Sequence, residues 1–144
     1  MTRLHGTCVL IGDIGVLLRG PSGAGKSDLA LRLIEGGARL VSDDQVEVRP
    51  EGARLMAEAP AAIAGMIEVR GLGIVRMPPV GPVPLGLVID LVPLEAVDRL
   101  PDEQTEEIAG IALPRLAFHP WEASAATKVR LAVQVATGTI MLVP

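Results

Sequence analysis

Residues 20–27 read Gly-Pro-Ser-Gly-Ala-Gly-Lys-Ser, and this octapeptide constrains the fold more than any other part of the chain. It fits the phosphate-loop pattern of Gly, four free positions, Gly, Lys and then Ser or Thr. Such a loop joins a strand to the N-terminus of a helix, where backbone N–H groups converge on phosphate oxygens. The apolar run Val16-Leu17-Leu18 precedes the loop, and residues 27–35 have helical periodicity. We therefore predict strand, loop and helix in that order, with a nucleotide triphosphate bound at the loop.

The residues of the loop carry the chemistry that phosphate binding needs. Its glycines let the backbone turn with the N–H groups pointing inward. Lys26 supplies a mobile positive charge for the β- and γ-phosphates, and the Ser27 hydroxyl can ligate Mg²⁺. We assign nucleotide binding to the whole octapeptide: Gly20, Pro21, Ser22, Gly23, Ala24, Gly25, Lys26 and Ser27.

The composition argues against nucleic-acid binding. The chain of 144 residues has one Phe, one Trp and no Tyr, so its core must be packed with aliphatic side chains. Binders of single-stranded nucleic acid stack bases on several aromatic side chains, which this chain lacks. Binders of duplex DNA carry a basic patch, whereas the net charge here is −4 and there is no basic run.

Cysteine usage and hydropathy indicate the compartment. The lone Cys8 excludes an internal disulfide and a cysteine-based zinc site, and we expect it to be a small buried residue. No stretch approaches the roughly 18 apolar residues of a membrane span, and the N-terminus lacks the pattern of a secretory signal. We expect a cytoplasmic protein that does not insert into the membrane.

The rest of the chain predicts a single α/β domain with a mixed sheet. Strands are expected at residues 8–11, 15–18, 39–42, 46–49, 54–56 and 85–92, and a second helix at residues 125–137. Gly36-Gly37 should end the first helix. Prolines predict a loop at residues 78–84, and we expect residues 93–107 to be loop-like or loosely helical and residues 113–120 to be irregular.

A phosphate loop needs a nearby carboxylate to hold the metal or to activate the nucleophile. Asp43 and Asp44 end the strand that follows the first helix, where an α/β unit brings them beside the loop. Successive side chains of an extended backbone point to opposite sides, so one aspartate could face the phosphates while the other binds a second group or caps a turn. Asp90 follows the apolar run Leu87-Val88-Ile89, as in ordinary phosphate-loop ATPases. The residues alone leave these alternatives open.

Three other polar residues are weak candidates by themselves. His5 precedes the first predicted strand, and His119 lies between Phe118 and Pro120. A lone histidine in such a place is usually exposed or already hydrogen-bonded. Arg99 could equally pair with a neighbouring surface carboxylate.

Three stretches together resemble the bacterial HPr kinase/phosphorylase family. They are residues 20–31, the segment Arg39-Leu-Val-Ser-Asp-Asp-Gln-Val-Glu-Val-Arg49, and Ile67-Glu-Val-Arg-Gly-Leu-Gly-Ile74, which looks like the family's own signature. The spacing between the stretches also agrees. The resemblance corresponds to the catalytic C-terminal half of longer members, so we expect residues 1–144 to be that domain, with no separate N-terminal domain.

The resemblance implies an ATP- and Mg²⁺-dependent kinase that phosphorylates a serine of HPr, the small phosphocarrier protein of the sugar phosphotransferase system. It implies the reverse dephosphorylation by phosphate as well. The implied fold is akin to phosphoenolpyruvate carboxykinase, and the implied assembly is a homo-oligomer, a hexamer in the family.

The resemblance also assigns roles by position. Asp44 would accept the seryl proton, and His5 falls where the family has a catalytic histidine. Arg99, in Asp98-Arg99-Leu100, matches the arginine that neutralises charge on the transferring group. Lys26 and Ser27 would hold the phosphates and Mg²⁺, with Glu68 as a further metal ligand. Asp90 gains no support from the resemblance.

The chain departs from the family pattern at two places. Pro21 stands where many members have Asp, which removes a carboxylate and a backbone donor from the loop. His119-Pro120-Trp121-Glu122 and the residues up to Lys128 replace the arginine-containing loop that longer members use in phosphorolysis, so kinase activity is the firmer expectation. Two alternatives remain: a small-metabolite kinase that uses Asp90, and a nucleotide-sensing module without catalysis.

Overall fold

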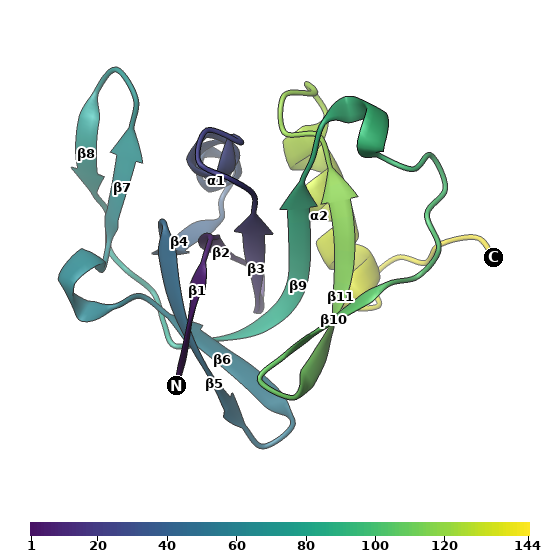
Figure 1. Ribbon diagram of the computed structural model, residues 1–144, viewed down its shortest axis with the longest axis horizontal. Helices are drawn as coiled ribbons and strands as arrows, with labels where there is room; N and C mark the ends of the chain where they lie inside the picture. Colours follow the sequence, from purple (N-terminus) through teal and green to yellow (C-terminus); the bar gives the residue numbers. More distant parts are fainter.

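The computed structural model describes all 144 residues and confirms the mixed α/β architecture (Figure 1). The strands are β1 Thr2–His5, β2 Thr7–Ile11, β3 Ile14–Arg19, β4 Arg39–Ser42, β5 Gln45–Glu51, β6 Arg54–Glu58, β7 Met66–Val69, β8 Gly73–Arg76, β9 Val83–Leu91, β10 Thr105–Ile108 and β11 Ile111–Phe118. The helices are α1 Lys26–Glu35 and α2 Ala125–Ala136, and short 3₁₀ turns lie at Ala61–Ile63 and Leu94–Ala96. No helix combines the length and the apolar character needed to cross a membrane.

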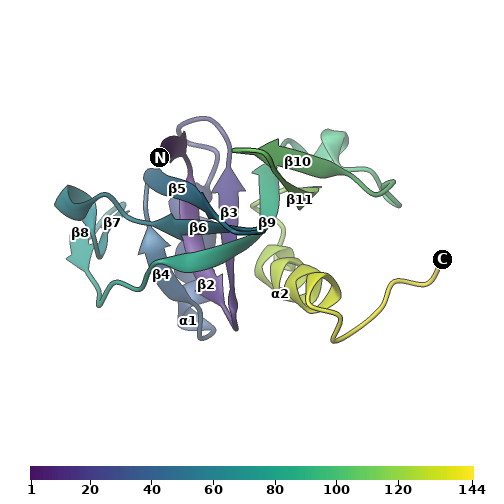
Figure 2. The same ribbon diagram turned by 90° about the horizontal axis from the view of Figure 1, so that it is seen from below.

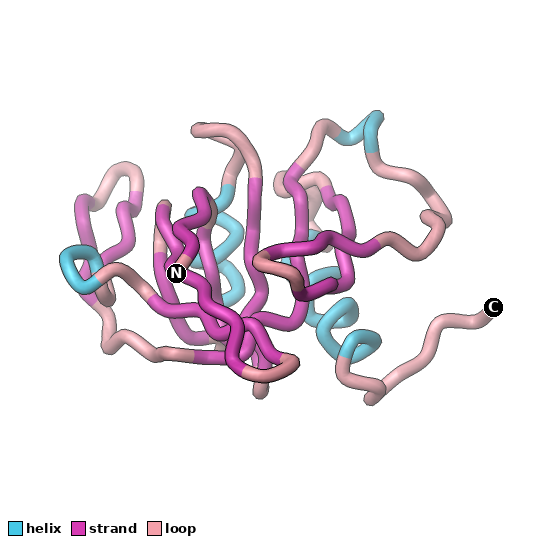
Figure 3. The backbone as a smooth tube through the Cα atoms, turned by 60° about the horizontal axis from the view of Figure 1, so that its bottom comes forward, coloured by secondary structure: helices cyan, strands magenta, loops and turns pink.

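A nine-stranded sheet forms the frame, and β9 is its central strand. The strand order is β1-β5-β6-β9-β3-β2-β4, and β9 also pairs with β11, which in turn pairs with β10. β9 runs parallel to β3 and β11 and antiparallel to β6, so the sheet is mixed as predicted. Because the start of β9 pairs with β6 and its end with β3 and β11, the strands curl around one another instead of lying flat (Figure 3).

Two buried clusters lie on opposite sides of the β2–β3–β4 strands (Figure 2). Along β3 the side chains alternate: Val16 and Leu18 pack towards the helices, whereas Leu17 packs towards β5 and β6. Leu29, Ala30 and Leu33 of α1 are buried on the predicted face of the helix. Cys8 is buried as expected, and burial raises the pKa of its thiol to about 12, which makes it a poor nucleophile at neutral pH.

Three segments differ from the sequence-based prediction. His5 does not precede the first strand but ends β1, a short and mostly exposed edge strand that pairs with β5. Residues 66–76 form the two-stranded hairpin β7–β8, which the glycines of this segment obscured in the sequence. The segment 93–107, which was predicted to be loop-like or loosely helical, ends in β10, which begins at Thr105.

The prediction that residues 113–120 are irregular is wrong, because most of this segment belongs to β11. Pro114 suggested a break, since proline cannot donate to a sheet ladder. It lies where β11 changes partner: Pro114 is opposite Thr105 of β10, and from Arg115 onward the strand pairs with β9. The missing N–H is thus placed at the junction between two ladders.

Candidate active site

The phosphate loop opens into a pocket of about 740 Å³, a size suited to a nucleotide. The pocket lies at the N-terminus of α1, between the β7–β8 hairpin on one side and the loop after β11 on the other (Figure 1). Eight of the predicted site residues line it: His5, Ser22, Gly23, Gly25, Lys26, Ser27, Asp44 and Glu68. Folding therefore gathers these residues from four separate parts of the sequence around one cavity.

The loop adopts the left-handed turns that its glycines allow. Gly23 has φ 82° and Gly25 has φ 97°, conformations that side chains rarely tolerate. Lys26 is only 8% exposed, and its Nζ donates to the carbonyl oxygens of Gly20 (2.6 Å) and Pro21 (3.0 Å). Pro21 cannot donate a backbone hydrogen bond, but its carbonyl also accepts one from the Ala24 N–H at 3.0 Å, which closes the loop. Pro21 therefore contributes to loop shape, whereas Gly20, Pro21 and Ala24, which were predicted to bind the nucleotide, do not line the pocket.

Asp43 is the central hydrogen-bond acceptor of the site. It directly follows β4, is 8% exposed, and its Oδ1 accepts from Ser27 Oγ (2.8 Å) and Thr7 Oγ1 (2.9 Å). Its Oδ2 accepts from the Glu68 backbone N–H at 3.3 Å. The sequence left open which aspartate of the pair faces the loop, and the structure gives that position to Asp43.

Asp44 has a different partner from Asp43, but alternation along an extended chain is not the reason, because β4 ends at Ser42 and the Asp44 backbone is left-handed. Its side chain is 71% exposed, and its backbone has φ 74°, which aspartate tolerates better than most residues. Its Oδ1 lies 3.2 Å from His5 Nε2. The register of β1 against β5 pairs His5 with Gln45, which brings the histidine beside Asp44 at the rim of the pocket. A carboxylate and an imidazole are thus held together within reach of the loop.

The donor set consists of hard oxygen ligands, which fit Mg²⁺. Ser27 and Asp43 offer hard oxygen ligands side by side, and Glu68 lines the same pocket from β7. No group of three or more His, Cys, Asp or Glu side chains is close enough to form a complete metal cage. Mg²⁺ characteristically binds one or two protein carboxylates and completes its shell with phosphate oxygens and water.

Asp90 is engaged elsewhere. Arg19 Nε donates to its Oδ1 at 2.7 Å and Arg115 Nε to its Oδ2 at 2.6 Å, while Arg19 also reaches Glu106 at 3.0 Å. Burial raises the pKa of the Asp90 carboxyl, but the hydrogen bonds and charges of Arg19 and Arg115 outweigh it, so the pKa lies below its usual value. Asp90 does not line the pocket. Its charge is neutralised by two guanidinium groups, which leaves it ill-suited to organise a metal.

Two other candidates lie outside the pocket. Arg99 is exposed in the segment between the second 3₁₀ turn and β10. His119 Nδ1 lies 3.0 Å from the Val92 carbonyl oxygen and so supports the loop after β11. The structure does not bring either residue together with Asp44.

Several residues that line the pocket were not identified as site residues from the sequence. Thr7, Arg70 and Trp121 all line the pocket, and Thr7 Oγ1 binds Asp43 directly. Arg70 lies within the signature stretch 67–74, but nothing in that stretch singles it out, and no motif marks Thr7 or Trp121, whose positions depend on the tertiary fold.

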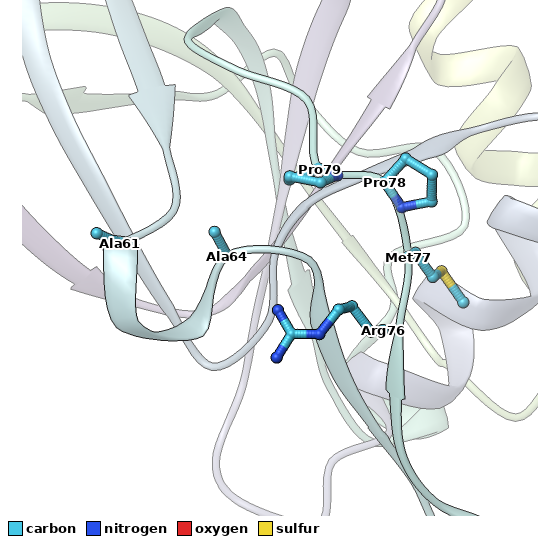
Figure 4. Close-up of a pocket in the computed structure, with 6 residues that line it drawn as sticks. All are labelled: Ala61, Ala64, Arg76, Met77, Pro78 and Pro79. Carbon is cyan, nitrogen blue, oxygen red and sulfur yellow. The ribbon is translucent and has the colours of Figure 1, made fainter.

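A second, shallower hollow is shown in Figure 4. It is lined by Ala61, Ala64, Arg76, Met77, Pro78 and Pro79. Without a carboxylate, a histidine or a nucleophile, it carries no chemistry comparable with the loop pocket.

Comparisons with known proteins identify the family of the chain. The family model described as "HPr Serine kinase C-terminal domain" matches residues 1–129. A protein of Geobacillus thermodenitrificans named HPr kinase/phosphorylase is 43% identical over 129 residues, which cover 81% of this chain and 42% of that protein. Its namesake from Clostridium tetani is 49% identical over 77 residues, covering 54% of this chain and 25% of that protein. The chain thus spans less than half the length of these curated relatives.

A solved structure has the same fold. It is titled "Structure of the Hpr(Ser) kinase/phosphatase from Coxiella burnetii" and superposes with a TM-score of 0.86 at 28% sequence identity. The match covers 96% of this chain and 98% of that one. The curled mixed sheet is therefore shared over nearly the whole length of both chains.

Proposed function

Because the chain belongs to the family of HPr serine kinase C-terminal domains, whose model covers residues 1–129, we propose that it is a Mg²⁺- and ATP-dependent kinase that phosphorylates a serine of HPr. The observation that carries the proposal is the pairing of two aspartates with two different partners. Asp43 lies 2.8 Å from the loop hydroxyl of Ser27, and Asp44 lies 3.2 Å from His5. A metal-organising carboxylate and a candidate base are thereby supplied by adjacent residues.

In this mechanism the phosphate chain binds along the loop. The backbone N–H groups of the loop and Lys26 bind the β- and γ-phosphates, so Lys26 Nζ exchanges its carbonyl partners for phosphate oxygens. Ser27 and Asp43 would hold Mg²⁺, with Glu68 beside them. When bound, Mg²⁺ would spread the negative charge that develops on the transferring group.

The acceptor serine enters at the His5 and Asp44 side of the pocket. Its hydroxyl oxygen attacks the γ-phosphorus, forming a P–O bond as the bond to the β-phosphate oxygen breaks and ADP departs. Asp44 orients the hydroxyl and takes its proton, and His5 fixes the carboxylate through the contact at 3.2 Å. Exposure of Asp44 suits this role, because the base must be reached by a serine on another protein.

The other expectations from the resemblance remain part of the proposal. Arg99 would act on the transferring group only if its exposed segment, or a second copy of the chain, brought it to the pocket. Reverse transfer, a homo-oligomeric assembly and a cytoplasmic location are proposed on the same basis, and residues 1–144 are proposed to be the catalytic domain. The alternative of a small-metabolite kinase that uses Asp90 is not favoured, because Arg19 and Arg115 both donate hydrogen bonds to the Asp90 carboxylate.

The test is transfer of labelled γ-phosphate from Mg²⁺-ATP to purified HPr. We expect labelled HPr from the wild-type chain, and none from an HPr variant whose acceptor serine is replaced by alanine. An Asp13→Asn variant is the matched control, since Asp13 lies exposed in the β2–β3 turn and outside the pocket. ATP binding without any labelled HPr would contradict the proposal and select the non-catalytic nucleotide sensor.

A further inference from the structure

The only tryptophan of the chain lies against the phosphate loop. Trp121 lines the pocket, yet it is 57% exposed. A Cβ built on Gly25 would lie 2.9 Å from Cζ2 of the ring and 3.1 Å from Cη2. One edge of the indole is therefore packed on the residue that precedes Lys26, while much of the ring remains open to the pocket.

The loop that carries Trp121 is fixed to the body of the protein from both sides. The Pro120 carbonyl accepts a hydrogen bond from Arg32 of α1, whose Nε also donates to Asp28 at 3.0 Å. On the C-terminal side of Trp121 in the sequence, Glu122 pairs with Lys128 of α2 at 2.9 Å. The loop that carries the indole is thus held to both helices next to Trp121.

The pocket has two ends, and only one is used by the proposed transfer. The β7–β8 hairpin with Glu68 lies on one side of α1, and the loop after β11 with Trp121 lies on the opposite side (Figure 1). His5 and Asp44 provide the chemistry for the acceptor, and Glu68 lies beside the proposed metal ligands Ser27 and Asp43. Phosphates that lie over Lys26 and Ser27 must continue into the rest of the nucleotide, and the side of the pocket with Trp121 and Asp28 remains for it.

We propose that Trp121 is the stacking platform for the base of the nucleotide. This inference rests on the proposed function, because it assumes that a nucleoside triphosphate binds the loop. An aromatic face stacks on any base, since every base has a π-face, so the platform contributes affinity without selecting a base by its hydrogen-bonding edge. Loss of such a stack weakens binding by about 5-fold to 100-fold.

The experiment compares two ligands that share the phosphates and differ in the base. ATP and inorganic tripolyphosphate are each titrated by calorimetry into wild type, Trp121→Ala and Trp121→Phe, with Mg²⁺ present. We expect Trp121→Ala to weaken ATP binding by about 5-fold to 100-fold, to leave tripolyphosphate binding within about 2-fold, and Trp121→Phe to restore most of the ATP affinity. In the wild type, ATP should quench the single tryptophan more strongly than tripolyphosphate does.

The outcomes separate this inference from the proposed function. If Trp121→Ala binds ATP as tightly as wild type does, the platform is refuted while the kinase proposal stands. Equal weakening for ATP and tripolyphosphate also overturns it, because Trp121 would then only support the loop through Gly25. Failure of the wild type to bind either ligand would overturn the proposed function and this inference together.

Discussion

Ser27 Oγ donates a 2.8 Å hydrogen bond to Asp43 Oδ1 and so connects the end of the phosphate loop to the end of β4. Thr7 of β2 donates to the same oxygen at 2.9 Å, and all three side chains lie at the base of the pocket. This contact places a buried negative charge beside the hydroxyl that the loop motif offers to a metal. The proposed Mg²⁺ site follows from it.

We predict that Mg²⁺ strengthens ATP binding by the wild type and that Asp43→Asn abolishes this strengthening. The amide keeps the shape and one acceptor but loses the charge that a hard cation requires. Calorimetric titration of ATP with and without Mg²⁺ measures the effect, and Asp13→Asn serves as the control. An undiminished Mg²⁺ enhancement in Asp43→Asn would show that the metal is held elsewhere.

Gly25→Ala should eliminate ATP binding and lower the free energy of unfolding by more than Gly12→Ala does. Both glycines have positive φ, 97° at Gly25 and 61° at Gly12, so each substitution carries a backbone strain of about 1–2 kcal/mol. Only at Gly25 does the new methyl group also meet a side chain, Trp121, whereas nothing lies within 4 Å at Gly12. Urea unfolding and ATP titration of both variants test the difference, and equal behaviour of the two would contradict the proposed contact.

Asp90 should stabilise the fold in a pH-dependent way without taking part in catalysis. Its pKa is lowered in the folded state, so its contribution is present above the ordinary value of about 3.8 and is lost as the pH falls through the folded pKa. Asp90→Asn should therefore cost about 1–3 kcal/mol at pH 7, and the difference from wild type should shrink below pH 3.8.

Urea unfolding of the wild type and Asp90→Asn across this pH range measures that difference. Transfer to HPr by the folded variant should stay within about 3-fold of wild type, because Asp90 does not line the pocket. If Asp90→Asn instead remains fully stable but cannot transfer phosphate, the result would support the alternative of a small-metabolite kinase that uses Asp90.

Local patterns were sufficient for much of the fold. The strand before the loop, the apolar face of α1 and the buried strand β9 all follow from periodicity and from the spacing of glycines. The strands β1 and β11 were harder to predict. β1 is short and exposed, and β11 contains Pro114 at the point where it changes partner, so neither has the alternation of a half-buried strand.

The candidate site was only partly foreseeable, because its contacts are long-range. The sequence identified the loop and both aspartates, but the choice between Asp43 and Asp44 depends on the left-handed backbone at Asp44. Asp90 does end a strand parallel to β3, as the ATPase pattern suggested, but the residue opposite it in the register is Arg19. A charged partner one residue before the loop cannot be inferred from the apolar run that contains Asp90.

The central claim is that Asp44 acts as the base for the seryl hydroxyl, and Asp44→Asn tests it most directly. Asparagine tolerates the φ of 74° found here, so the variant should fold and bind Mg²⁺-ATP within about 3-fold of wild type. Single-turnover transfer of phosphate from pre-bound ATP to HPr should then be slower by about 10²–10⁴-fold. A variant that binds ATP normally and transfers phosphate at the wild-type rate would contradict the account.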